Sequence, residues 1–263
     1  MVRRKSIFRN SSYYYLCNSC LDRRLLFREN EDYLYFLYLL YYLNRPTAIE
    51  LRHLNLDFSN KKTRHFRSRT PVQLPYVKII GFCLLPNSFS LIVKQLASDG
   101  ISNFMRKLGT GYSLHYNKKY LRSGPIFCGS FKSIYLDKNA IKKALLFIHL
   151  LPSRLFTHIL LKNRYLKIKK YIWSSLPYYL GQRNWSPLLK YNKKSSPSSY
   201  TKTLKEMIFT SKLNWKYPCL SKKLDHNIQE FVLNINNFSN ILMLEIFING
   251  FYFLSQIQDI NLI

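Results

Sequence analysis

The residues with the clearest chemical potential are basic side chains interleaved with tyrosines over residues 106–132. They are Arg106, Lys107, Tyr112, Tyr116, Lys118, Lys119, Tyr120, Arg122 and Lys132. Lys and Arg hold phosphates, and aromatic rings stack on unpaired bases. This spacing predicts a DNA-binding surface, and the alternative is a merely solvated charged face.

The charge of the whole chain points to the same class of partner. The 263 residues include 41 Lys and Arg against 13 Asp and Glu, a formal net charge of +28. Such an excess repels itself in a compact state and favours a polyanionic partner. The 21 Tyr and 18 Phe favour nucleic acid over an anionic membrane. An AT-rich genome would also enrich Lys and aromatics, but it explains the scarcity of acids poorly.

The sequence predicts neither a metal site nor a membrane anchor. Cys17 and Cys20 form a lone CxxC, and Cys83, Cys128 and Cys219 do not supply a second pair at zinc-site spacing. No apolar run approaches the roughly 20 residues that span a bilayer. No apolar segment follows the basic start as it would in a secretory signal. We expect no cofactor and no membrane partner, and a cytoplasmic, nucleoid-associated location.

Hydrophobic periodicity predicts an α+β fold. Strand patterns cover residues 13–18, 76–84, 89–94 and 131–136. One helix pattern begins at 30–32, and a second begins near 98–99, where Ser98 is the expected cap. A third helix pattern covers 139–151 and is ended by Pro152. This order predicts a ferredoxin-like antiparallel sheet with helices packed on it, plus a C-terminal helical extension.

The charge distribution suggests three parts of the chain. Residues 201–263 hold 6 Lys and 5 acids, so nearly all of the excess charge lies before them. A Ser- and Lys-rich stretch with a proline precedes that tail. We expect a domain over 1–185, a linker over 186–200 and a helical extension over 201–263.

Six stretches in order resemble the IS200-like (Y1, HUH-type) transposase family, in its REP-associated tyrosine transposase branch. They lie at 15–18 with 26–33, at 81–91, at 100–124, at 127–133, at 147–152 and at 171–181. The resemblance implies binding of single-stranded or hairpin DNA during DNA transposition. It also implies strand cutting by a tyrosine beside a metal ion, where two histidines and a polar amide hold Mg²⁺ or Mn²⁺.

This chain departs from the family pattern at all four catalytic positions. Ser88 and Ser90 stand where the family has its two histidines. Phe147 stands where the family has the nucleophile, and Leu151 where it has the amide. Serine is a poor divalent-metal ligand beside imidazole, and the other two side chains have no oxygen or nitrogen. We therefore expect a DNA binder that is unable to nick DNA.

Two alternatives remain open at the level of sequence. The first is an active transposase that uses other residues, such as His149, or His115 together with Tyr112. The second is a basic RNA- or ribosome-binding protein on the same scaffold. A further basic run, Arg64, His65, Arg67 and Arg69, is interpreted equally well as a phosphate-binding arm or as a loop.

Overall fold

A four-stranded antiparallel sheet forms the centre of the molecule. The computed structural model describes residues 8–46, 74–156, 160–182, 188–189 and 197–209. The strands are β1 (Tyr13–Ser19), β2 (Val77–Leu85), β3 (Ser88–Gln95) and β4 (Lys132–Leu136). They pair in the order β2-β3-β1-β4, and every neighbouring pair is antiparallel. Each strand begins and ends within one residue of its predicted range.

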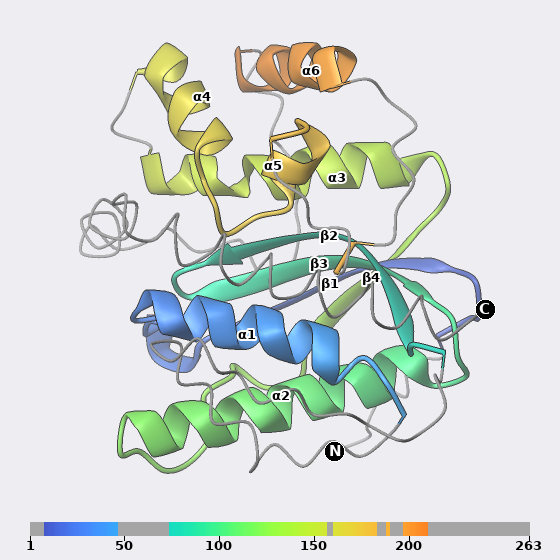
Figure 1. Ribbon diagram of the computed structural model, residues 1–263, viewed down its shortest axis with the longest axis vertical. Helices are drawn as coiled ribbons and strands as arrows, with labels where there is room; N and C mark the ends of the chain where they lie inside the picture. Colours follow the sequence, from blue (N-terminus) through green and yellow to red (C-terminus); the bar gives the residue numbers. More distant parts are fainter. Residues whose placement is uncertain (1–7, 47–73, 157–159, 183–187, 190–196, 210–263) are drawn as a thin grey trace, which may run out of the picture.

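Helices cover both faces of this sheet. The elements are η1 (Leu21–Arg23), α1 (Asn30–Tyr42), α2 (Gly100–Lys119), α3 (Ala140–Leu150), η3 (Leu151–Phe156), α4 (Leu161–Lys169), α5 (Leu176–Tyr179) and α6 (Pro197–Phe209). Figure 1 shows α1 and α2 on one face and α3 to α6 on the other. The order β1-α1-β2-β3-α2-β4 with this strand arrangement is ferredoxin-like. The predicted fold class is confirmed.

Alternation along β3 decides which side chains meet which helix layer. The ring of Phe89 lies 5.0 Å from the ring of Phe36 in α1, so Phe89 points toward the α1–α2 layer. Successive strand residues point to opposite faces. Ser88 and Ser90 therefore face the layer that contains α3.

Two helix boundaries differ from the sequence prediction. The cap residue of α2 is Asp99, which has a left-handed backbone with φ 51°, and not the expected Ser98. Pro152 lies beyond the end of α3 as expected, but the chain continues there as the 3-10 segment η3. Proline is tolerated at that place because the first turn of a helix needs no backbone donor.

The segment after the domain is partly built into the fold. Residues 197–200, expected in the linker, form the first turn of α6, which packs against α3 and α4. Tyr200 and Leu204 of this helix are buried. The basic run at 64–69 and the rest of the expected extension lie outside the described residues. No helix in the described part of the chain is long and apolar enough to cross a membrane.

Candidate functional site

On the α3 face of the sheet, Tyr15 contacts two of the four positions at which the sequence predicts lost catalytic residues, Ser90 and Phe147. Its hydroxyl group lies 2.9 Å from the Oγ atom of Ser90, and its ring centroid lies 6.3 Å from that of Phe147 in α3. Tyr15 is directly opposite Ile92, so it reaches Ser90 diagonally across the β1–β3 pair. All three side chains are buried. A phenol is thus present beside Ser90, but it comes from β1.

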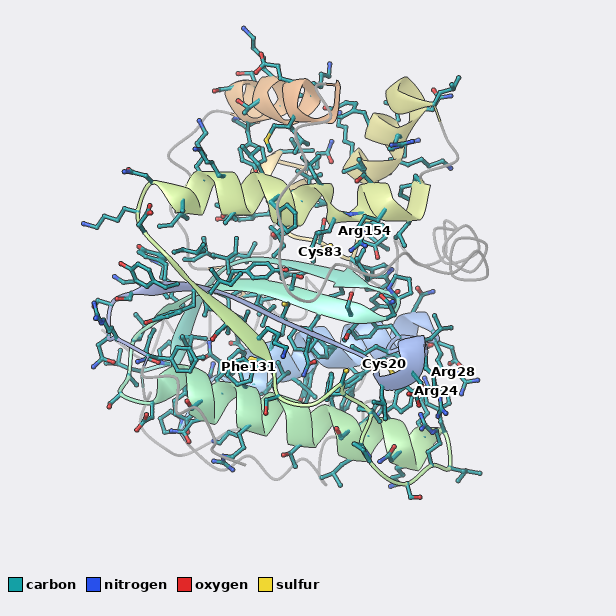
Figure 2. The ribbon with its side chains drawn as sticks, turned by 180° about the vertical axis from the view of Figure 1, so that it is seen from behind. Cys20, Arg24, Arg28, Cys83, Phe131 and Arg154 are labelled. Carbon is teal, nitrogen blue, oxygen red and sulfur yellow. The ribbon has the colours of Figure 1, made fainter. Side chains whose placement is uncertain are left out.

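The other two of these four positions, Ser88 and Leu151, are also buried. Ser88 precedes Ser90 by two residues on β3, and its hydroxyl donates to the side-chain oxygen of Asn87 at 3.2 Å. Leu151 follows Phe147 by one helical turn. Arg154 of η3 lies on the α3 side of the sheet (Figure 2), where burial lowers the pKa of its guanidinium and the nearby Tyr15 opposes that shift.

The chemistry of this cluster is that of a packed core. The oxygen atoms that meet at Ser90 are its own hydroxyl and the phenol of Tyr15, which are weak ligands for a divalent cation. Among the described residues, no three His, Cys, Asp or Glu side chains gather closely enough to hold a metal ion. Tyr15 has no exposed surface, so a phosphodiester cannot approach its phenol in this conformation.

His149 belongs to a separate buried network. Its Nδ1 atom lies 2.6 Å from the hydroxyl of Tyr200 in α6, and its Nε2 atom lies 2.7 Å from Oγ of Ser175. Ser175 Oγ also accepts a hydrogen bond from the backbone N–H of Phe82 in β2. The imidazole has no exposed surface, and burial lowers its pKa to about 3. This neutral, fully buried imidazole links α3 to α6 and to Ser175, which is a structural role and not a catalytic one.

Three of the predicted DNA-binding cations are exposed. Arg106 and Lys118 lie on the surface of α2, and Lys132 lies at the start of β4. Lys and Arg side chains carry a positive charge at neutral pH, so each of the three is able to contact a phosphate.

The predicted stacking of Tyr112 and Tyr116 on bases does not agree with their burial. Both rings are enclosed, and both hydroxyls donate to backbone carbonyl oxygens, Tyr112 to Leu26 at 2.6 Å and Tyr116 to Leu25 at 2.9 Å. The i, i+4 spacing that suggested a stacking face also describes a core face of α2. His115, named above with Tyr112 as an alternative catalytic pair, is half-buried against Tyr35, with ring centroids 3.6 Å apart.

Other predicted DNA-binding residues have partners inside the protein. Lys119 forms ion pairs with Asp32 at 2.9 Å and Glu29 at 3.1 Å, and the hydroxyl of Tyr120 donates to Asp32 at 2.6 Å. Lys107 donates to the carbonyl oxygens at positions 45 and 46. These contacts hold α2 against the segments around α1 and use donors that the sequence prediction assigned to DNA.

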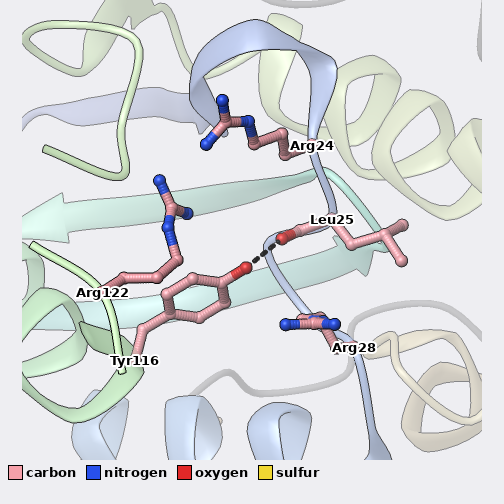
Figure 3. Close-up of a pocket in the computed structure, with 5 residues that line it drawn as sticks. All are labelled: Arg24, Leu25, Arg28, Tyr116 and Arg122. Atoms are coloured by element: carbon pink, nitrogen blue, oxygen red, sulfur yellow. Dashed lines mark hydrogen bonds between the residues drawn. The ribbon is translucent and has the colours of Figure 1, made fainter. Parts of the chain in front are cut away.

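Sequence reasoning missed two arginines that lie next to Arg122. Arg24 and Arg28 come from the segment between β1 and α1, and with Leu25, Tyr116 and Arg122 they line a pocket of about 320 Å³. Figure 3 shows the side chains of Arg28 and Arg122 beside Tyr116, with Arg24 farther from its ring. The spacing of four residues between Arg24 and Arg28 is visible in the sequence, but their distance from residue 122 conceals the group.

Comparison with solved structures finds a likeness in fold. A structure of the REP-associated tyrosine transposase bound to a REP hairpin is similar over 74% of this chain and 94% of its own. The TM-score is 0.46 and the sequence identity 10%, so the likeness establishes no shared function. No protein-family model matches the chain, and no curated protein matches it.

Proposed function

We propose that this chain binds single-stranded or hairpin DNA in the manner of an IS200-like transposase but does not cut it. The proposed binding rests on one observation, a net charge of +28 on a chain whose described surface exposes Arg106, Lys118 and Lys132. A surface of this sign attracts phosphates and releases their counterions on binding.

The loss of cutting is supported by the closed cluster of Ser90, Tyr15 and Phe147. A transposase-like cut needs a nucleophilic oxygen that reaches phosphorus and a cation that polarises the phosphate. The phenyl ring of Phe147 packs on the α3 side of this cluster without an oxygen atom, and the Ser90 hydroxyl is engaged by Tyr15. Both hydroxyl groups belong to buried residues.

A covalent adduct assay tests the loss of cutting. The full chain is incubated with a single-stranded hairpin oligonucleotide and Mg²⁺ or Mn²⁺, and the products are separated on a denaturing gel. We expect no protein–DNA adduct. An adduct would overturn the proposal, and its persistence in Tyr15→Phe would show that another residue is the nucleophile.

A competition experiment tests the choice of DNA over RNA. Labelled hairpin DNA is bound to the protein and displaced with unlabelled DNA hairpin or with structured RNA of equal length. We expect the DNA hairpin to compete at lower concentration. Stronger competition by the RNA would favour the RNA- or ribosome-binding alternative, while absence of any binding would reject both.

A further inference from the structure

The pocket between the β1–α1 segment and the end of α2 concentrates positive charge in a concave site. Arg24, Arg28 and Arg122 line it together with Leu25 and Tyr116, and no carboxylate is among the lining residues. Figure 2 places Arg24 and Arg28 near Cys20, which follows the end of β1. Three guanidinium groups around one cavity repel each other unless an anion lies between them.

Aromatic rings, rather than acids, position two of these arginines. The guanidinium of Arg28 lies 4.3 Å from the ring centroid of Tyr120, and that of Arg122 lies 5.8 Å from the ring centroid of Tyr116. A ring contact holds a guanidinium while leaving most of its N–H groups available to a ligand. The Arg24–Asp22 pair spans 3.6 Å between side chains that are more than half exposed, so it holds Arg24 only weakly.

Two nearby acids are already engaged elsewhere. Asp32 is fully buried and accepts hydrogen bonds from Lys119, from Tyr120 and from the backbone N–H groups of Arg28 and Glu29. Glu29 is paired with the same lysine. These acids therefore stabilise the start of α1, and neither of them lines the pocket.

The walls of the pocket are fixed by backbone contacts. The hydroxyl of Tyr116 donates to the carbonyl oxygen of Leu25, as the dashed line in Figure 3 marks. The N–H groups of residues 26 and 27 donate to the carbonyl oxygen of Pro86. Leu121 has a left-handed backbone with φ 49°, and the N–H of Arg122 donates to the carbonyl oxygen of Asn117. A non-glycine residue seldom adopts that conformation without support from its surroundings.

From this arrangement we propose that the three-arginine pocket binds a phosphate group and prefers a phosphomonoester at the end of a DNA strand. A phosphomonoester carries about −1.5 to −2 charges at pH 7 and three acceptor oxygens. A phosphodiester within a strand carries a single charge, so it matches three arginines less well. Guanidinium forks bind phosphate oxygens in pairs, which adds geometric selectivity. This proposal rests on the proposed DNA binding for the source of the phosphate.

The first experiment uses three versions of one hairpin oligonucleotide, with a 5′-phosphate, a 3′-phosphate or hydroxyls at both ends. Dissociation constants are measured by fluorescence anisotropy for the full chain. We expect one phosphorylated version to bind about tenfold more tightly than the hydroxyl version, as charge-assisted hydrogen bonds imply. Arg122→Gln should remove that difference.

Two matched variants separate a built pocket from general attraction. Arg122→Lys keeps the positive charge but loses the paired N–H donors of the guanidinium group. It should therefore also lose most of the difference in affinity between the phosphorylated and hydroxyl oligonucleotides. Lys142→Gln removes one exposed cation on α3, outside the pocket, and should preserve the difference. Circular dichroism and thermal unfolding check that each variant is folded.

Inorganic phosphate gives a readout that does not depend on DNA binding. Added phosphate should raise the unfolding temperature of the wild-type chain by more than it raises that of Arg28→Gln, because a ligand that binds only the folded state stabilises that state. If this difference appears without any DNA binding, the proposed function fails while the pocket stands.

Two results would count against the pocket as described. If Arg122→Gln weakens all three oligonucleotides equally and more than Lys142→Gln does, the preference for a strand end is overturned and the pocket binds backbone phosphate. Equal behaviour of the wild type and all pocket variants, with the oligonucleotides and with inorganic phosphate, would overturn the whole proposal.

Discussion

The hydroxyl group of Tyr112 shows how a single buried oxygen serves stability. It donates a 2.6 Å hydrogen bond to the carbonyl oxygen of Leu26, and the tyrosine has no exposed surface. Tyr112→Phe would leave that carbonyl without this donor. We expect a loss of about 1–2 kcal/mol in the free energy of unfolding, measured by urea denaturation.

An exposed tyrosine supplies the control for this substitution. Tyr135 in β4 is 58% exposed, so Tyr135→Phe should change the free energy of unfolding by less than about 0.5 kcal/mol. If the two variants lose the same stability, the hydroxyl of Tyr112 is not the buried donor described above.

The buried imidazole of His149 predicts sensitivity to acid. Burial lowers its pKa to about 3, whereas the imidazole of an unfolded chain titrates near 6.5. Below about pH 6.5 the unfolded chain gains a proton that the folded chain does not, so stability is lost as the pH falls toward 3. Each pH unit in this window costs about 1.4 kcal/mol from this group. Urea denaturation at several pH values measures the slope.

The contribution of His149 is isolated by substitution. His149→Gln removes the titrating group, so its pH slope between about 6.5 and 4 should be flatter than that of the wild type. Burial also lowers the pKa of His115, so His115→Gln should flatten the slope as well. An unchanged slope in His149→Gln would mean that this imidazole titrates alike in the folded and unfolded chains.

Within the helix α2, substitution of two glycines by alanine should change the stability of the protein in opposite directions. Gly100 begins the helix, and a Cβ atom there would clash with the carbonyl oxygen of Tyr76. That oxygen also accepts hydrogen bonds from the N–H groups of Leu96 and Ala97, so it cannot move freely. We expect Gly100→Ala to cost about 1–3 kcal/mol in the free energy of unfolding, as other overpacked sites do.

Gly109, in the same helix, has open space around its Cα atom. Apart from its two chain neighbours and the nearby backbone of its own helix, no atom lies within 4 Å of the place that a Cβ would take. Gly109→Ala should therefore stabilise the protein by about 0.5–1 kcal/mol, because alanine loses less backbone entropy in a helix. Thermal unfolding of the two variants tests both predictions. If Gly100→Ala stabilised the protein as Gly109→Ala is expected to do, the close packing at Gly100 would be contradicted.

The elements of the fold were predictable from sequence, but their contacts were not. Period-two patterns identified strands because side chains alternate between two faces. The pairing of Tyr15 with Ser90 depends on the register between β1 and β3, and no local pattern encodes it. Tyr112 was expected at the surface because helical spacing does not tell which face is buried. Arg24 and Arg28 were missed because only the folded chain brings them to residue 122.

The net charge of +28 predicts how the whole molecule responds to salt. If about six phosphates are contacted, the logarithm of the DNA-binding constant should fall with the logarithm of salt concentration at a slope of about −5. Between about 50 and 200 mM salt this amounts to a loss of roughly 10³ in affinity. Filter binding or anisotropy across that range measures the slope.

Single substitutions connect this slope to the described surface. Arg106→Gln removes an exposed cation of α2, so the slope should become shallower by about 1 if that side chain contacts a phosphate. Lys142→Gln removes the same charge from α3 and should leave the slope unchanged, because a cation remote from the DNA releases no counterions on binding. Equal effects of the two variants would mean that the protein attracts DNA through its overall charge. A nearly flat response in the wild type would mean that the basic surface is only solvated.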